Sequence, residues 1–311
     1  NNFMKIFDCF TFFNELELLE LRLKMLSPYV DYFVLVESNI TFRGDQKPFY
    51  FNPNEKIFQP YIHKIIHLKY ENIPQTTKPN DYSLEIQQRN YISKGLEQSN
   101  ICQANDIVII SDLDELPNPD ILKQLKTNSI STKNNLLKLH RIFRKRKDKL
   151  TAYSKYLQLL LKYYQNKSIL DILNITPLGF SQKHYYYYMN NQYTDKWWGS
   201  VISFYKNMKS PQDLRDVRRH LPVLNNGGWH FSYMGGVDRI VTKQNSIVDE
   251  DSSHQQNKTY NSSYVKNCLT NGTRIATHQA TQNHVFTKIS IDEIGIKNLN
   301  EFAQKYPYMF L

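Results

Sequence analysis

The sequence predicts an α/β fold with a mainly parallel central sheet flanked by helices. Between residues 3 and 111, hydrophobic segments rich in β-branched and aromatic side chains alternate with amphipathic segments. Strands that alternate with helices are typical of a parallel sheet, because a crossover helix returns the chain to the edge where the next strand begins. The chain has 311 residues, of which 41% are hydrophobic, so it can form one large domain or two small ones.

The first predicted elements are a strand, a helix and a second strand. Residues 3–12 are apolar and aromatic, as expected for a buried strand. Residues 14–26 carry leucines three or four positions apart, which predicts a helix with Asn14 as its cap. Residues 30–38 are rich in valine and aromatic side chains, and we expect this second strand to end near Glu37.

The following segments continue the alternation. Residues 61–70 predict a third strand, residues 82–99 a helix, and residues 106–111 another buried strand. Parallel sheets of this kind bind ligands beyond the carboxyl ends of their strands, which is where Glu37 and Asp112 stand in this sequence. We therefore expect a functional site at this edge of the sheet.

From about residue 118 the pattern changes to helices, aromatic clusters and glycines. We expect helices at 118–127 and 150–173, a strand-rich segment at 184–205, a glycine-punctuated loop at 225–236 and a closing helix at 291–306. Neither an internal repeat nor a linker-like composition divides the chain. These features favour a single domain.

The net charge of +10 raises the question of an anionic partner. The densest basic segments are residues 141–149 and 215–220, and neither lies in a recognisable nucleic-acid module. We therefore expect a solvated basic face and no nucleic-acid partner. The alternatives are an anionic ligand such as a diphosphate, a lipid surface, or nucleic acid after all.

The cysteines indicate the redox compartment. Cys9, Cys102 and Cys268 are widely spaced and form no metal-ligand pattern. Isolated cysteines in an odd number favour a reducing environment, so we expect a cytoplasmic protein. No run of about 20 apolar residues suits a membrane span, and we expect no transmembrane segment in this chain. The alternative is a Golgi-luminal or membrane-associated fragment that lacks its anchor.

The most informative stretch is the acidic end of the strand that contains Ile107–Ile110. Asp112, Asp114 and Glu115 follow the apolar residues at once. Two aspartates separated by one residue can both reach a hard cation such as Mn²⁺ or Mg²⁺, which prefers oxygen ligands and also accepts phosphate oxygens. The plainer interpretation is an acidic loop that caps the helix beginning near Pro119.

Four further side chains extend this candidate site. His230 is a candidate metal ligand beside a Gly-Gly pair, although a lone histidine is more often structural. Trp197, Trp198 and Trp229 have core packing as their plainer interpretation. Because tryptophan stacks on sugar rings while offering a polar edge, we also consider these residues as acceptor-binding residues.

Several segments together resemble glycosyltransferase family 17, the β-1,4-mannosyl-glycoprotein 4-β-N-acetylglucosaminyltransferase-like proteins. The matching segments lie in the family's order within roughly residues 5–245: 8–23, 31–44, 47–51, 88–90, 106–119, and the sequences YYYYMN, WWGSV and GGWHFSYMGG. The resemblance implies a GT-A fold over residues 1–311, with a D-x-D motif that holds Mn²⁺ or Mg²⁺. It also implies inverting hexosyl or N-acetylhexosaminyl transfer, with UDP-GlcNAc as donor and a mannose hydroxyl of a carbohydrate as acceptor.

The resemblance also implies roles for single residues. Asp112 would face the ribose or the metal, Asp114 would be a metal ligand, and His230 would lie near the metal or diphosphate. Glu37 would lie near the base or ribose, Arg89 near the nucleotide, and Lys243 against a phosphate.

An inverting transfer needs a carboxylate as general base on the acceptor hydroxyl. Asp195, Asp238 and Glu115 are the candidates, and the sequence does not separate them. Residues 141–183 are longer and more basic than the family pattern, which predicts a helical basic insertion on the acceptor side. Two other functions use the same features: a metal-dependent phosphatase or nucleotidyl enzyme, and a non-catalytic glycan-binding protein.

Overall fold

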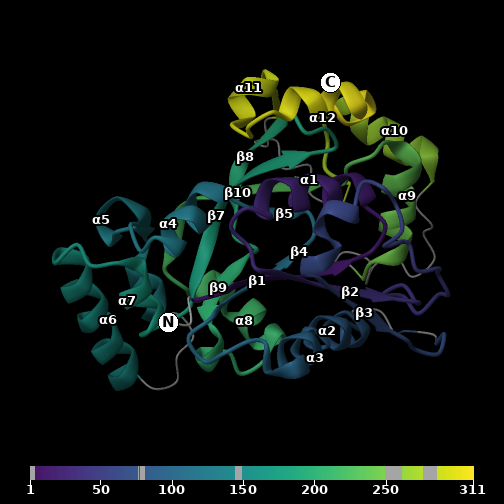
Figure 1. Ribbon diagram of the computed structural model, residues 1–311. Coiled ribbons are helices and arrows are strands. Elements are labelled where there is room, and N and C mark those ends of the chain that lie inside the picture. The colour runs from purple at the N-terminus through teal and green to yellow at the C-terminus, as the bar shows by residue number, and fades with distance from the viewer. Residues whose placement is uncertain (1–3, 76, 78–80, 144–148, 249–260, 276–285) are drawn as a thin grey trace.

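The computed structural model describes residues 4–75, 77, 81–143, 149–248, 261–275 and 286–311 (Figure 1). Within these residues the strands form one mixed sheet in which β11-β8-β7-β9-β4-β1-β2-β3 are consecutive neighbours. The sheet therefore consists of a parallel half and a half in which antiparallel pairs dominate.

The parallel half contains four strands from the first part of the chain. They are β1 (Ile6–Phe12), β2 (Tyr32–Ser38), β3 (Ile65–Tyr70) and β4 (Ile107–Asp112). Strand β1 is central, because it pairs in parallel with both β2 and β4, and β2 pairs in parallel with β3. The predicted strands and their parallel arrangement are confirmed here.

The other half of the sheet corrects the expectation of a mainly parallel sheet. Its strands are β5 (Glu115–Pro117), β6 (Leu136–Leu137), β7 (Leu178–Tyr186), β8 (Asn191–Trp197), β9 (Val201–Phe204), β10 (Val223–Ser232) and β11 (Phe286–Lys288). Only β7 and β10 pair in parallel, whereas β4 with β9, β9 with β7, β7 with β8 and β8 with β11 are antiparallel. Short connections between β7, β8 and β9 produce this result, because they are too short for a crossover.

Strand β10 also corrects the prediction of a glycine-punctuated loop at 225–236. Most of that segment continues the sheet: Gly227 and Gly228 lie within β10 and permit close packing of strands, whereas Gly235 and Gly236 belong to the turn after it. A Cβ on Gly228, which has φ +131°, would lie 2.0 Å from the Leu116 carbonyl oxygen on β5. Only glycine therefore allows β10 to approach β5 this closely.

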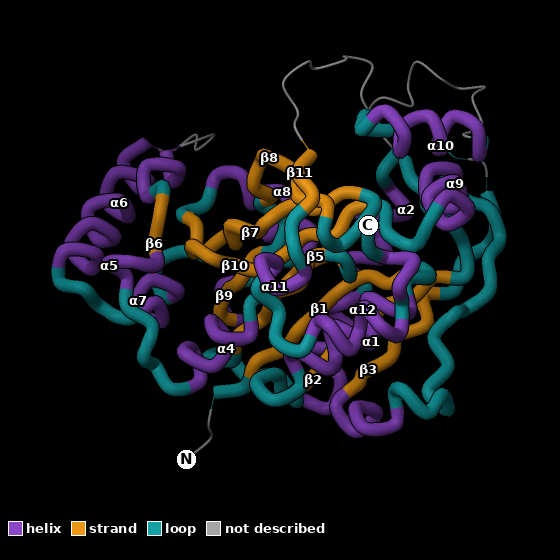
Figure 2. The backbone as a smooth tube through the Cα atoms, turned by 90° about the horizontal axis from the view of Figure 1, so that it is seen from above, coloured by secondary structure: helices purple, strands orange, loops and turns teal. Residues whose placement is uncertain are grey.

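Helices cover both faces of the sheet (Figure 1). They are α1 (Leu16–Leu26), α2 (Ser83–Asn90), α3 (Ile92–Glu97), α4 (Pro119–Lys126), α5 (Thr132–Asn135), α6 (Lys149–Tyr164), α7 (Ile169–Leu173), α8 (Pro211–Val217), α9 (Val237–Ser246), α10 (Ser262–Asn271), α11 (Ile291–Ile294) and α12 (Leu299–Lys305). Along β1 the side chains alternate between two cores: Phe10 packs in the core that includes α1, and Cys9 in the core that includes α3. Figure 2 shows α5, α6 and α7 together at one edge of the molecule, and α9 beside α10 at the other.

Some helix boundaries differ from the predictions. The helix at 82–99 is two helices, α2 and α3, and the closing helix is the pair α11 and α12. The N-cap residue of α1 is Glu15 rather than Asn14, and the Glu15 side chain makes no capping hydrogen bond. In the predicted basic insertion, residues 144–148 lie outside the described residues, α6 and α7 are helical, and residues 178–183 belong to β7.

None of the described helices is both long and apolar enough to span a membrane.

Candidate functional site

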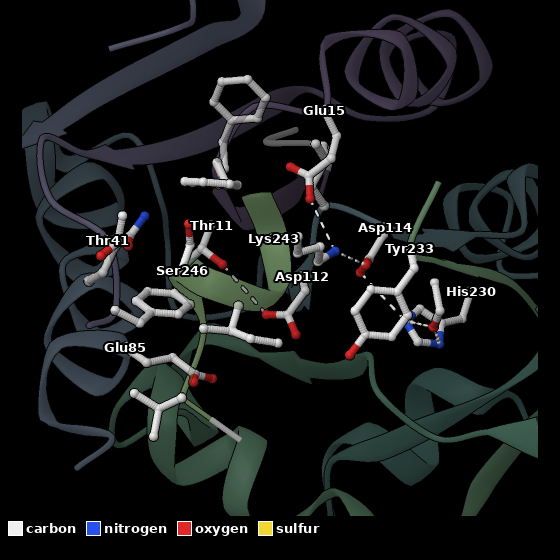
Figure 3. A pocket seen from close by; sticks show the side chains of 18 of the residues that line it. Thr11, Glu15, Thr41, Glu85, Asp112, Asp114, His230, Tyr233, Lys243 and Ser246 are labelled. Carbon is white, nitrogen blue, oxygen red and sulfur yellow. Dashed lines mark hydrogen bonds and ion pairs between the residues drawn. The ribbon is translucent and has the colours of Figure 1, made fainter. Parts of the chain in front are cut away.

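The acidic end of β4 opens into a cavity of about 490 Å³ at the carboxyl ends of the parallel strands. Its lining includes Thr11 from the end of β1, and Asp112 and Asp114 from the end of β4 and the turn after it. Figure 3 shows these two aspartates with Lys243 from α9 and His230 from β10 beside them. The site predicted at this edge of the sheet therefore coincides with a cavity of the size typical for small-molecule ligands. We call it the donor cavity, after the donor site that the resemblance to glycosyltransferase family 17 implies.

The backbone of the acidic turn is held by a buried arginine from α1. Arg22 is fully buried, and its guanidinium binds the Asp8 carboxylate at 2.6 and 2.7 Å. The same guanidinium donates to the carbonyls of residues 112, 113 and 115 at 2.9–3.1 Å. A fixed guanidinium fork that satisfies three carbonyls fixes the shape of the turn before any ligand binds.

Asp112 is bound by two arginines. Arg215 from α8 binds one of its carboxylate oxygens, and Arg89 from α2 donates to the other at 3.0 Å. Burial alone would raise the pKa of Asp112, but the charges of Arg215 and Arg89 outweigh it and hold this pKa well below its usual range. Asp112 is therefore ionised and already paired on both oxygens.

Asp114 faces a lysine and a histidine. Lys243 donates to one carboxylate oxygen at 2.8 Å, and the Nε2 atom of His230 lies 3.6 Å from the other. Lys243 also contacts Glu15 at 3.1 Å. Burial would raise the pKa of Asp114, but Lys243 and His230 lower it far below the ordinary value. Asp114 is thus ionised and faces one lysine and one histidine, rather than two arginines.

His230 belongs to a stack of rings that the sequence did not reveal. Its ring lies 4.4 Å from the Trp197 ring and 4.7 Å from the His184 ring, centroid to centroid. His184 stands directly opposite His230 in the pairing of β7 with β10, and its Nε2 atom lies 2.9 Å from the Ser232 hydroxyl. Burial, with His230 and Arg274, lowers the pKa of His184 to about 2, so this imidazole is neutral.

The residues considered for metal binding do not all converge. Within the described ranges, no group of three or more His, Cys, Asp or Glu side chains is arranged to hold a metal ion. Asp114 and His230 lie together, whereas Asp112 is bound by Arg215 and Arg89. The chain itself therefore offers two adjacent ligand groups, one oxygen and one nitrogen.

The three candidate bases occupy different environments. Glu115 is fully buried, where it accepts hydrogen bonds from Arg215 at 2.6 and 2.8 Å and from the Trp197 indole at 2.6 Å. Asp238 is exposed in the first turn of α9 and does not line the donor cavity. Asp195 on β8 is exposed and lines a second cavity that adjoins the first. Only Asp195 combines access to solvent with a place in a cavity.

Glu37 lies behind the donor cavity rather than in its lining. It is fully buried and accepts hydrogen bonds from the backbone N–H groups of Tyr50 and Phe51. The Nζ atom of Lys47, which does line the cavity, is 3.9 Å from this carboxylate. Glu37 therefore positions the loop that carries Lys47.

The three tryptophans also separate. Trp197 lines both cavities and Trp198 lines the second one. Trp229 is 6% exposed and belongs to the main core, where its indole N–H donates to the Ile294 carbonyl at 2.7 Å. Among the three, Trp197 and Trp198 are thus the ones that a ligand in either cavity can reach.

Several site residues were missed at the level of sequence. Arg215 stands in the basic segment 215–220, for which we expected a solvated face, yet it is 4% exposed and binds both Asp112 and Glu115. Lys47 and His184 stand in the aromatic segments 47–51 and 184–188, whose composition predicts core packing rather than a polar site. Arg215 is surrounded in the sequence by Asp213, Asp216 and two further arginines, so no local pattern marks it as buried.

Comparison with known proteins finds similarity to one family in the first part of the chain. Residues 1–143 match the model of glycosyltransferase family 17. Two similar proteins, from Homo sapiens and Rattus norvegicus, are both named β-1,4-mannosyl-glycoprotein 4-β-N-acetylglucosaminyltransferase. Each is 28% identical over 116 residues, which cover 36% of this chain and 22% of the relative. No solved structure matches this chain.

The family match confirms the predicted resemblance over residues 1–143, which include β1 to β4 and the acidic turn; the segments after residue 143 lie outside the match. The aligned part spans about a fifth of the length of these curated relatives.

Proposed function

We propose that this chain, whose first 143 residues match glycosyltransferase family 17, transfers the sugar of a nucleoside diphosphate sugar to a carbohydrate hydroxyl. The donor we propose is UDP-GlcNAc, in keeping with the names of the similar proteins. The observation that carries the proposal is the pair Asp112 and Asp114 at the carboxyl end of β4, in a cavity that also contains several cationic side chains. Such a cavity can bind a diphosphate and its sugar together.

The cations of the donor cavity suit a leaving diphosphate. Lys47, Arg89 and Lys243 line it, and they come from three separate parts of the chain. Departure of a nucleoside diphosphate builds negative charge on its phosphate oxygens, and preorganised cations stabilise that charge. Lys243 contacts both Asp114 and Glu15, and the rotatable stem of a lysine allows its ammonium group to turn from these carboxylates to a phosphate.

We further propose that Asp114 and His230 bind Mn²⁺ or Mg²⁺. Their facing oxygen and nitrogen are 3.6 Å apart, and both side chains line the donor cavity, so they fit a cation whose other ligands are water and diphosphate oxygens. When bound, the ion supplies positive charge to the diphosphate. Asp112, which both arginines hold, then faces the nucleotide side of the cavity.

For the general base we propose Asp195. An inverting transfer removes the proton of the acceptor hydroxyl as that oxygen attacks the sugar carbon from the face opposite the leaving diphosphate. Asp195 lines the cavity that adjoins the donor cavity, whereas Glu115 is enclosed by Arg215 and Trp197. Asp195→Asn is expected to abolish transfer while leaving donor affinity within about twofold, which separates a base from a binding residue.

Calorimetric titration tests the donor site directly. UDP-GlcNAc, UDP-glucose and UDP-galactose are titrated with Mn²⁺ or with EDTA into the wild type, Asp114→Asn and Asp120→Asn. Asp120 is an exposed aspartate in the first turn of α4 and serves as the matched control. We expect metal-dependent binding that weakens by about 100-fold in Asp114→Asn, the equivalent of about 2.7 kcal/mol, and is unchanged in Asp120→Asn. Absence of binding by every UDP-sugar in Mn²⁺ would overturn the donor assignment.

A further inference from the structure

A second cavity adjoins the donor cavity. It has a volume of about 500 Å³ and lies between β8, the residues after α8, and Arg274, which follows α10. His184, Trp197, Arg219 and Arg274 line both cavities, so the two are continuous. We call the second cavity the basic groove.

The charge of the basic groove is strongly one-sided. Of the residues that the structure describes, its lining contains five cationic side chains, Arg141, Lys196, Arg218, Arg219 and Arg274, against the single carboxylate of Asp195. Among the described residues, no carboxylate forms an ion pair with Lys196, Arg218 or Arg219. Such an excess of unneutralised positive charge in a concave site attracts anions.

Arg218 shows the effect of this excess on one side chain. Its guanidinium donates to the Arg215 carbonyl at 2.7 Å, which holds it at the wall of the groove. Burial, together with the neighbouring Arg215 charge, lowers the pKa of Arg218 to about 10. A bound anion would relieve both effects, because it replaces lost hydration and offsets the repulsion.

Aromatic rings give the same groove a surface for sugar. Trp197, Trp198 and Tyr193 line it. The Trp198 ring lies under two cations, with Lys138 Nζ 4.0 Å and the Arg141 guanidinium 4.4 Å from its centroid. Indole rings stack on the apolar faces of sugars, and adjacent cations bind the charged groups that such sugars carry.

We propose that the basic groove binds the acceptor, and that this acceptor is an anionic saccharide with a phosphate or carboxylate group. The inference rests on the proposed glycosyltransferase function and adds the chemical class of the acceptor. The groove joins the donor cavity at Trp197, so a sugar stacked there lies next to the transferred sugar. Its volume suits one or two sugar rings better than a nucleic-acid strand.

Binding of simple probes tests this inference. Mannose 6-phosphate, glucuronate and neutral mannose are titrated into the wild type at saturating UDP, with tryptophan fluorescence as the readout. The same titrations use Lys196→Ala/Arg219→Ala, and Lys209→Ala/Lys123→Ala as the matched control, since Lys209 and Lys123 are exposed lysines outside both cavities. Phosphate and carboxylate probes show which anion the groove prefers.

We expect at least one anionic probe to bind about tenfold or more tightly than mannose. This preference should fall below about threefold in Lys196→Ala/Arg219→Ala, stay unchanged in the control, and weaken with added salt. Equal binding of mannose and both anionic probes would overturn the inference. So would an anion preference that survives in the groove variant, or tighter binding of a short single-stranded oligonucleotide than of either anionic sugar.

The donor titration separates this inference from the proposed function. If UDP-GlcNAc binds but the anionic probes show no preference, the acceptor class is wrong and the donor site stands. If no UDP-sugar binds and the anionic probes still show the preference without UDP, the groove is an anion site and the glycosyltransferase proposal fails.

Discussion

The donor cavity and the basic groove share four lining residues but differ in how their charges are compensated. In the donor cavity Arg89 pairs with Glu85 and Asp112, and Lys243 pairs with Glu15 and Asp114. In the groove the described carboxylates leave Lys196, Arg218 and Arg219 without an ion pair. Ion pairs fix the positions of side chains, but the opposite charges cancel each other's electrostatic potential. Unpaired cations leave a positive potential in the cavity. The first cavity is therefore preorganised, and the second is attractive to anions.

The largest effect is expected from removing Arg215, which pairs with carboxylates beside the donor cavity. Arg215→Ala leaves the fully buried Glu115 without its cationic partner and leaves Asp112 with Arg89 alone. Loss of one partner from a buried ion pair costs about 3–5 kcal/mol in the free energy of unfolding. Urea denaturation measures this cost. Arg219→Ala, an exposed arginine of the same segment, is the control and should change stability by less than about 0.5 kcal/mol. A loss below about 1 kcal/mol for Arg215→Ala would contradict the structural role given to this ion pair.

A smaller effect, on UDP affinity, is expected from removing Lys243. Lys243→Ala removes the lysine that neutralises Asp114, so a diphosphate would meet an extra negative charge. We expect UDP affinity to fall by about 10- to 30-fold, or about 1.4–2 kcal/mol. Calorimetric titration of UDP measures the affinity, and Lys123→Ala on the exposed face of α4 is the control. Equal affinity for UDP in Lys243→Ala and wild type would show that this lysine does not contact the nucleotide.

The donor cavity should also lose affinity for UDP as pH rises. Burial lowers the pKa of Lys47 to about 8, although Glu37 and Glu15 act in the opposite direction. The ammonium group is therefore charged below pH 8 and neutral above it, so affinity should fall by a few-fold between pH 7 and 9. An arginine keeps its charge throughout, and Lys47→Arg should show a flat profile. If both proteins show the same slope, Lys47 is not the group that titrates.

The same shift has a consequence for stability. The unfolded chain keeps an ordinary lysine pKa of about 10.4, which lies above the folded value. Between about pH 8 and pH 10.4 the unfolded state binds more protons, and the Lys47 contribution therefore makes the folded state more stable as pH rises. The difference between wild type and Lys47→Met in urea denaturation at pH 7 and pH 9.5 measures it. The stability of Lys47→Met relative to wild type should be higher at pH 7 than at pH 9.5.

Trp229 and Trp197 should respond differently to substitution by phenylalanine. Trp229→Phe removes the hydrogen bond to the Ile294 carbonyl and should cost about 1–2 kcal/mol in stability without changing the binding of any saccharide. Trp197→Phe should instead weaken saccharide binding, because this ring lines both cavities. Urea denaturation and saccharide titration of the two variants form a matched pair. Weaker saccharide binding in Trp229→Phe would place that residue at the acceptor site.

The amino-acid pattern alone was sufficient for local features. Alternating strands and helices from residue 6 to residue 112 predicted β1 to β4, and the isoleucine run before Asp112 predicted an acidic strand end at the edge of the sheet. These features depend on periodicity over a few residues, which a sequence displays directly. The family match lies in the same part of the chain.

Only the tertiary structure decided which groups meet. Arg215 and Asp112 are 103 positions apart, and Lys243 and Asp114 are 129 positions apart. The antiparallel strands and the direction of β10 likewise depend on which strands pair across the sheet. A basic residue looks the same in the sequence whether it is solvated, like Arg219, or buried against a carboxylate, like Arg215. Burial and pairing are properties of long-range packing, and the chemistry of both cavities follows from them.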